Sequence, residues 1–231
     1  MSIAENIARV RAELADAAAE AGRRPEEIFL VGASKMNGAE ACREAVAAGI
    51  DALGENRVQE MVKKLAENAY DGAPLHFIGH LQRNKVNKVV GKVSLIQSVG
   101  SLELLDEIEK TAARLELTQN ILLEVNIGGE AAKSGFAPEA VFTAAEAALS
   151  RQHVRVLGLM TIPPAAADRE TNMRYFQEVH TLYVDIDENL FHNELKYLSM
   201  GMSGDYADAV RAGATMVRVG SAIFGARKYS L

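Results

Sequence analysis

One lysine stands out in this sequence because its position suits covalent chemistry. Lys35 follows the apolar run of residues 28–33, separated from it only by Ser34. An amine at the end of a buried strand is partly desolvated, so it loses its proton more readily and can attack an aldehyde to form a Schiff base. Position alone leaves a second interpretation open, which is a solvated lysine at the end of a strand.

Two loops near the C-terminus have the composition of a phosphate site. Residues 199–205 are rich in glycine and serine, and a second small-residue segment follows Arg218 at Gly220 and Ser221. Small residues let the backbone approach an anion, and a following helix presents free N–H groups to it. Two tight turns that simply require glycine are the alternative interpretation.

An alternation of strands and helices runs through the whole chain and must position these residues. A capped, amphipathic helix over residues 2–21 comes first. Short apolar runs, typical of buried parallel strands, then predict strands over residues 28–33, 52–54, 75–78, 93–98, 120–125, 154–160, 196–199 and 216–219. Between them we expect helices over residues 39–48, 58–69, 82–90, 102–115, 138–149, 168–187 and 205–212, with a last helical turn from Ser221.

This order predicts the α/β class and a single (β/α)8 TIM-type barrel with an extra N-terminal helix. Strict alternation implies a parallel sheet, and eight units favour closure over an open sheet. No G-x-G-x-x-G fingerprint follows the first strand. Because no linker-like stretch divides the chain, we expect one domain over residues 1–231.

In such barrels the chemistry lies at the carboxyl ends of the strands. The polar or notable residues at these ends are Lys35, Asn56, His80, Ser98, Asn126, Met160, Ser199 and Arg218. Barrels also often bind phosphate with the loops after strands seven and eight, which are the two small-residue loops here. A phosphate site facing a lysine on strand one suits a phosphorylated aldehyde, and both pyridoxal 5′-phosphate (PLP) and an aldolase substrate fit that description.

Composition excludes several other classes of protein. The net charge of −6 argues against a broad nucleic-acid surface, and no apolar run is long enough to span a membrane. The single cysteine, Cys42, excludes an internal disulfide and a cysteine metal cluster, and the five histidines show no metal-ligand spacing. We therefore expect a cytoplasmic protein without a metal site, a nucleic-acid partner or a membrane partner.

Six stretches, in order, resemble those of one known family. They are Gly32–Lys35, Gly54–Glu60, His76–Gln82, Gly158–Met160, Leu198–Ser203 and Arg218–Gly225. The chain resembles the pyridoxal phosphate homeostasis proteins (the YggS/PROSC family), which are related to the barrel domain of alanine racemase. The resemblance runs from about residue 3 to residue 227.

The resemblance implies a PLP-binding barrel and a role for each matching residue. Lys35 holds the cofactor as a Schiff base, and Ser203, Gly220 and Ser221 bind its phosphate. Arg218 faces the pyridine nitrogen; an arginine there keeps that nitrogen unprotonated and makes PLP a weaker electron sink. The remaining cofactor-binding residues that we expect around the ring are Asn56, His80, Ser98, Met160 and Ser199.

Two lysine positions need comment. Asn37 stands where some relatives have a second lysine, so a relay through that position is in doubt. Lys133 matches a loop lysine of the family, and both a secondary aldehyde-reactive site and a solvated lysine remain open for it.

The resemblance favours a protein that holds PLP and hands it on, with no dedicated catalytic activity and with PLP-dependent apoenzymes as recipients. A PLP-dependent racemase and a lysine aldolase are the alternatives. Two-base racemisation needs a second base opposite Lys35, for which Tyr206 and Tyr229 are the nearest candidates. We expect a monomer or a weak homodimer, in which the N-terminal helix either covers the bottom of the barrel or supports the dimer.

Overall fold

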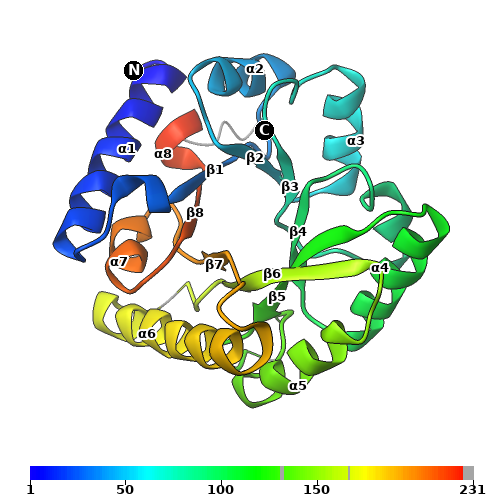
Figure 1. Cartoon of the computed structure of the whole chain (residues 1–231). Coiled ribbons are helices and arrows are strands. Elements are labelled where there is room, and N and C mark those ends of the chain that lie inside the picture. The colour runs from blue at the N-terminus through cyan, green and yellow to red at the C-terminus, as the bar shows by residue number, and fades with distance from the viewer. Residues whose placement is uncertain (131–132, 166, 226–231) are drawn as a thin grey trace.

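The computed structural model describes residues 1–130, 133–165 and 167–225. Its eight strands form a closed parallel barrel in which β1 pairs with both β2 and β8 (Figure 1). The strands are β1 (Phe29–Ala33), β2 (Ala52–Glu55), β3 (Leu75–Phe77), β4 (Leu95–Val99), β5 (Gln119–Val125), β6 (Val154–Thr161), β7 (Tyr197–Ser199) and β8 (Met216–Val219). The predicted (β/α)8 barrel is confirmed.

Helices surround the barrel in chain order, as the alternating pattern predicts. They are α1 (Ile3–Glu20), α2 (Ala39–Ala47), α3 (Val58–Ala66), α4 (Leu102–Arg114), α5 (Pro138–Leu149), α6 (Arg169–Ile186), α7 (Tyr206–Arg211) and α8 (Ser221–Phe224). Short 3-10 segments lie at η1 (Pro25–Glu27) and η2 (Arg83–Lys88), and a π-helical turn at η3 (Asp187–Phe191) extends α6. None of the helices in the described ranges is long and apolar enough to cross a membrane.

The expectation of an ordinary helix over residues 82–90 was wrong in type. The structure has only the 3-10 segment η2 there, and Val86 is its one buried residue. Val86, Val89 and Val90 do have helical i, i+3, i+4 spacing, but all three lie in the last part of the stretch, and this apolar face is too short to stabilise a full α-helix.

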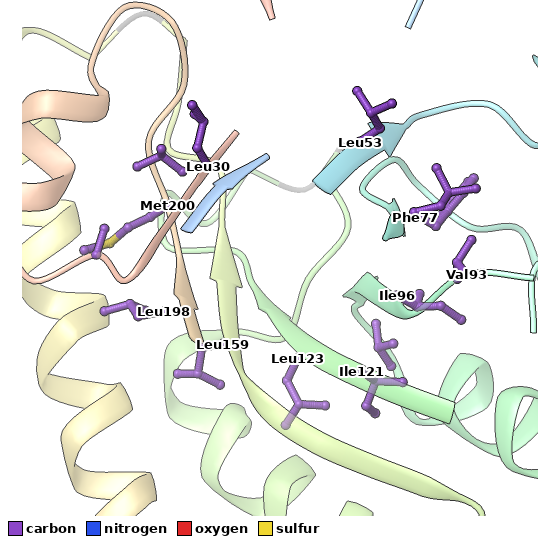
Figure 2. Packing of buried hydrophobic residues seen from close by; sticks show 14 of the residues in the cluster. Leu30, Leu53, Phe77, Val93, Ile96, Ile121, Leu123, Leu159, Leu198 and Met200 are labelled. Carbon is purple, nitrogen blue, oxygen red and sulfur yellow. The ribbon is translucent and has the colours of Figure 1, made fainter. Parts of the chain in front are cut away.

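Alternate residues of each strand face opposite sides of the barrel wall, and both sides are apolar. The outward side packs against the helices, as Figure 2 shows for Leu30, Leu53, Phe77, Ile96 and Leu123. A second, inward cluster fills the barrel and contains Val31, Ala52, Leu95, Leu122, Leu157, Met160 and Met216. This two-sided burial explains the continuous apolar runs of the sequence.

The N-terminal helix takes a place in the outer ring of helices, next to α7 and α8 (Figure 1). Its buried side presents Ile7, Val10 and Leu14 to the outward core. The Asn6 side chain donates a hydrogen bond to the Ile223 carbonyl at 2.9 Å, which fixes α1 to α8. Because α8 has only four residues, α1 supplies the apolar cover that a longer last helix would give.

Candidate functional site

The candidate residues at the strand ends gather at one end of the barrel. Lys35 lies two residues beyond β1, Asn56 one residue beyond β2 and His80 three residues beyond β3. Ser98 and Met160 are the next-to-last residues of their strands, Ser199 ends β7, and Arg218 lies within β8. Because all eight strands are parallel, these positions share the carboxyl edge of the barrel.

The two small-residue loops meet at the start of α8. The Ser203 hydroxyl accepts hydrogen bonds from the backbone N–H groups of Gly220 and Ala222, at 3.1 and 3.3 Å. A Cβ added at Gly220 would lie 3.3 Å from the carbonyl oxygen of Ala33, the last residue of β1. Ser203, Gly220 and Ser221 are therefore brought together beside the strand that leads to Lys35.

The loop after β7 is held in one conformation by two features. Gly201 has φ of +92°, and a Cβ there would lie 2.6 Å from the Cβ of Ala209. This combination requires glycine, because L side chains rarely adopt that backbone conformation. The Asp205 carboxylate accepts a hydrogen bond from the Met202 N–H at 2.6 Å, so the loop reaches α7 in a fixed shape.

Arg218 lies inside the barrel mouth with only 3% of its surface exposed. Its guanidinium donates to the Ser199 hydroxyl at 2.5 Å and to the Thr161 carbonyl at 2.9 Å. Burial lowers its pKa to about 10, against the attraction of Glu124 and Asp205, so the side chain stays charged at neutral pH. Within the described residues no carboxylate is in ion-pair contact with this cation.

A chain of hydrogen bonds continues from Arg218 through the barrel interior. The Ser199 hydroxyl donates to Gln97 Oε1 at 2.7 Å, and Gln97 Nε2 lies 3.0 Å from His76 Nδ1. The His76 ring stacks on Phe29 at a centroid distance of 5.7 Å. Burial lowers the pKa of His76 to about 4, so the ring is neutral at pH 7. We call Arg218, Ser199, Gln97 and His76 the inner chain.

Two adjoining cavities open at the mouth of the barrel. One, of about 570 Å³, is lined by Asn56, His80, Glu124 and Lys133 among others. The second, of about 560 Å³, shares His80, Lys133 and Ser134 with it and reaches Ser98. Asn56 Oδ1 is buried without a hydrogen-bond partner in the part of the chain that the structure describes. A buried oxygen of this kind suits a donor supplied by a ligand.

Glu124 is a residue of this mouth that the sequence reasoning missed. Burial raises the pKa of its carboxyl, and the Ser134 hydroxyl donates to its Oε2 at 2.9 Å. The signal was present, because Glu124 is the one acidic residue in the apolar strand of residues 119–125 and lies next to its end.

Ser98 and Met160 support the mouth, Ser98 by a hydrogen bond within it and Met160 by packing beneath it. The Ser98 hydroxyl donates to the Gly79 carbonyl at 2.6 Å and so holds the turn that carries His80. Gly79 is required there, since an added Cβ would lie 2.3 Å from the Asn56 carbonyl oxygen. Met160 is fully buried and packs in the inward cluster below the mouth.

Of the residues for which the sequence left alternatives open, Lys133 lies at the mouth and Tyr206 does not. Lys133 lines both cavities, pairs with Glu130 and donates to the Pro163 carbonyl at 3.3 Å. The Tyr206 hydroxyl instead donates to Glu13 of α1, in the outer layer of helices. Tyr229 lies outside the described residues.

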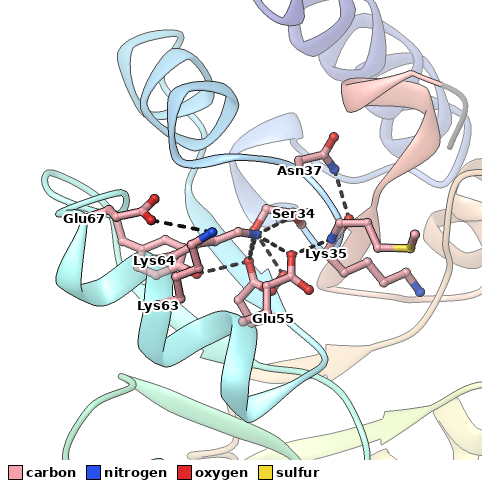
Figure 3. Close-up of polar contacts among 11 residues, drawn as sticks. Ser34, Lys35, Asn37, Glu55, Lys63, Lys64 and Glu67 are labelled. Atoms are coloured by element: carbon pink, nitrogen blue, oxygen red, sulfur yellow. Dashed lines mark hydrogen bonds and ion pairs between the residues drawn. The ribbon is translucent and has the colours of Figure 1, made fainter. Parts of the chain in front are cut away.

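A buried polar cluster lies behind the backbone of Lys35 (Figure 3). Glu55 Oε1 accepts from Lys64 Nζ at 2.6 Å, from the Ser34 hydroxyl at 2.6 Å and from the Tyr70 hydroxyl at 3.1 Å. Lys64 also pairs with Glu60 at 2.8 Å. We call Glu55, Lys64, Glu60, Ser34 and Tyr70 the outer cluster.

The ionisation of this cluster is set by burial and by close charges. Burial alone would lower the pKa of Lys64, but its contacts with Glu55 and Glu60 raise it, so the ammonium stays charged. Burial raises the pKa of Glu55, which the contact with Lys64 opposes. In the described ranges no group of three or more His, Cys, Asp or Glu side chains is arranged to hold a metal ion.

Comparisons with known proteins place this geometry in context. The family model of the alanine racemase N-terminal domain matches residues 3–228. A pyridoxal phosphate homeostasis protein of Aquifex aeolicus is 42% identical over 99% of this chain and all of its own length. PipY of Synechococcus elongatus, in a solved structure with PLP bound, superposes with a TM-score of 0.85 at 32% identity, covering 97% of this chain and 100% of PipY.

A more distant likeness concerns the fold alone. Alanine racemase of Corynebacterium glutamicum superposes with a TM-score of 0.73 at 15% identity. The match covers 97% of this chain and 61% of the racemase.

Proposed function

The chain belongs to the alanine racemase N-terminal domain family and, within it, to the pyridoxal phosphate homeostasis proteins, and from this we propose that it binds PLP as a Schiff base on Lys35. In this proposal the Lys35 amine adds to the aldehyde with loss of water. The protein thereby stores the cofactor and supplies it to apoenzymes. The observation that carries the proposal is the convergence of the two small-residue loops beside the strand that precedes Lys35.

The residues at the mouth suit PLP in charge and in hydrogen-bonding groups. The Ser203 hydroxyl and the N–H groups at the start of α8 would hold the phosphate, because a helix N-terminus attracts anions. Arg218 offers a cation whose direct partners are a hydroxyl and a carbonyl, so its charge remains for a ligand. The unpaired Asn56 Oδ1 adds a buried acceptor close to the cavity.

Bound PLP supplies an aldehyde that captures amines and a ring that accepts electrons. The protein's part is to orient the ring and to set its proton affinity. The charged Arg218 would disfavour a proton on a ring nitrogen that it faces, which weakens the electron sink and suits storage better than catalysis. Asn56, His80, Ser98, Met160 and Ser199 would enclose the ring, with Ser199 acting through its bond to Arg218.

The racemase alternative receives little support from the position of Tyr206. Its hydroxyl is bonded to Glu13 in the outer layer of helices, and burial raises its pKa to about 12, so it is poorly placed to act as a base at the mouth. The aldolase alternative makes a different prediction, which is that Lys35 is modified by its sugar-phosphate substrate and carries no PLP.

Borohydride trapping tests the proposal. The purified protein with added PLP would be reduced, and the modified lysine mapped by peptide mass spectrometry, for wild type, Lys35→Ala and the exposed-lysine control Lys92→Ala. We expect one dominant phosphopyridoxyl group on Lys35, retained in Lys92→Ala and lost in Lys35→Ala. Wild-type protein without an adduct on Lys35 would contradict the proposal.

Exchange of substrate Cα hydrogen with deuterium separates a carrier from an enzyme. A carrier exchanges amino-acid Cα hydrogen only slowly and without preference among amino acids. Rapid exchange of one amino acid would favour the racemase alternative instead.

A further inference from the structure

We propose that Glu60 and Lys64 of α3 are positioning residues that fix the backbone on both sides of Lys35 and thereby set how fast its amine captures a phosphorylated aldehyde. The inference rests on the proposed function, since it assigns Lys35 the covalent role. It adds two residues that contact the backbone around Lys35 and that line neither of the two cavities described at the mouth.

The contacts flank Lys35 on each side. Lys64 Nζ donates to the carbonyl of Ser34 at 2.8 Å, immediately before Lys35. Glu60 Oε1 accepts from the N–H of Met36 at 2.6 Å, immediately after it. Glu60 and Lys64 are themselves paired at 2.8 Å. One ion pair on α3 therefore holds both peptide groups that frame Lys35.

The backbone here needs to be held. Met36 has φ of +63°, the left-handed conformation that non-glycine residues avoid. Left-handed geometry is unfavourable for an L residue, because its Cβ crowds the following carbonyl oxygen. The charge-assisted bond from Met36 N–H to Glu60 offsets part of this cost, and the Asn37 side chain adds a bond of 3.0 Å to the Lys35 carbonyl.

The cluster acts on Lys35 through the backbone and not through its amine. In Figure 3 the Lys35 side chain extends away from Glu55 and Lys64, which lie on the other side of the barrel wall. Lys64 is 4% exposed and directs its ammonium at Ser34, Glu55 and Glu60. Burying a charged lysine is costly unless it is paired, and the contacts with Glu55 and Glu60 supply that pairing. The buried Lys64 contact thus keeps the Ser34 carbonyl in place while Lys35 reacts.

A matched pair of variants separates the hydrogen bond between Met36 N–H and Glu60 from the ion pair between Glu60 and Lys64. Glu60→Gln keeps an oxygen that can accept from Met36 N–H, whereas Glu60→Ala removes it. The Glu60 side chain is 21% exposed, so both variants should fold. Amide hydrogen exchange gives a readout without PLP: we expect the Met36 amide to exchange faster in Glu60→Ala and to stay protected in Glu60→Gln.

Covalent capture gives the second readout. With PLP added, we expect trapping at Lys35 to be roughly tenfold slower in Glu60→Ala, because misplacement of a reacting group is costly, and near the wild-type rate in Glu60→Gln. Far-UV circular dichroism at the same temperature shows that both variants are folded. A merely structural role would lower the melting temperature without changing the rate of capture by folded protein.

Lys64→Met and its neighbour Lys63→Met provide an independent pair. Lys63 lies on the same helix with its side chain 78% exposed, so its loss should change neither exchange nor capture. We expect folded Lys64→Met to capture PLP slowly at Lys35 and to distribute the label over other lysines.

The outcomes separate the two proposals. If Glu60→Ala and Lys64→Met capture PLP at Lys35 as fast as wild type, the positioning role is wrong and the proposed function stands. If wild-type protein forms no adduct on Lys35, the proposed function fails and this inference fails with it.

Discussion

The barrel wall separates two buried polar systems that solve different problems. The outer cluster pairs its charges directly, with Lys64 in contact with both Glu55 and Glu60. The inner chain carries the cation of Arg218 on neutral partners, namely Ser199, the Thr161 carbonyl and, further in, Gln97 and His76. Both systems are buried apart from Glu60, whose side chain is 21% exposed, yet only the outer one neutralises its charge by direct contact.

The difference teaches what each system is for. A paired charge that is sealed in the outer layer holds backbone, as the contacts with Ser34 and Met36 show. A charge supported by hydroxyl and carbonyl groups keeps most of its field for whatever enters the mouth. The outer cluster therefore serves geometry, whereas the inner chain offers electrostatic attraction to an anionic ligand.

The largest effect should come from breaking the outer ion pair. Lys64→Met leaves Glu55 buried without its cation, and we expect it to lower the free energy of unfolding by about 3–5 kcal/mol. Urea unfolding measures this, and Lys63→Met should stay within about 0.5 kcal/mol of wild type.

A double variant tests whether the cost is that of an unpaired charge. Glu55→Gln combined with Lys64→Met removes both buried charges, so it should be more stable than the sum of the two single changes predicts. Simple additivity would mean that the outer cluster is not held by charge, and the contrast with the inner chain would disappear.

The two systems should respond to acid in opposite directions, because burial lowers the pKa of His76 in the inner chain and raises the pKa of Glu55 in the outer cluster. Burial lowers the pKa of His76 from 6.5 to about 4. Between these two pH values the unfolded chain binds a proton at His76 and the folded protein does not. The stability that His76 gives is complete above pH 6.5 and is lost as the pH falls toward 4. At about 1.4 kcal/mol for each pKa unit, the loss is about 3 kcal/mol.

Urea unfolding between pH 7 and pH 4 checks the sign and the window. In His76→Gln the curve of stability against pH should be flatter over that range, and the exposed-histidine control His192→Gln should follow wild type. A His76→Gln curve as steep as that of wild type would assign the acid sensitivity to other groups.

The barrel itself could be predicted from sequence because its strands are buried on both faces. Runs such as residues 28–33 and 121–123 are apolar without a break, and each is followed further along the chain by a segment of helical spacing. Residues 82–90 were less tractable because their apolar residues gather at one end, and a 3-10 segment formed instead of an α-helix. For α1 the sequence offered two places, the bottom of the barrel or a dimer interface, because its apolar face indicates burial but does not identify the neighbours, which the structure shows to be α7, α8 and α2.

The mouth was easier to predict than its supports. Lys35, Ser199 and Arg218 follow from the rule that strand ends meet at one edge. Lys64 was missed, although its spacing of three from Met61 places it next to the buried face of α3. From sequence alone a lysine in a helix is expected to be solvated. Its burial becomes clear only from the structure, which brings Glu55 and Glu60 into contact with it.

The smallest expected loss of stability comes from replacing one serine of each system by alanine. Ser199 and Ser34 are both fully buried. Ser199→Ala leaves Arg218 Nη1 and Gln97 Oε1 without their shared partner, and we expect a loss of about 1–3 kcal/mol. Ser34→Ala removes one of three donors to Glu55 Oε1, whose other donors remain, so a loss nearer 1 kcal/mol is expected.

Ser199→Ala should also weaken PLP binding, since Arg218 loses the contact that orients it. Ser34→Ala should weaken PLP binding less than Ser199→Ala does, because Ser34 contacts Glu55 and not Arg218. Titration of each variant with PLP, beside urea unfolding, checks both halves. If Ser34→Ala weakened PLP binding more than Ser199→Ala did, the outer cluster would be acting on the ligand's charge as well as on the backbone, and the two systems would not divide their work across the barrel wall.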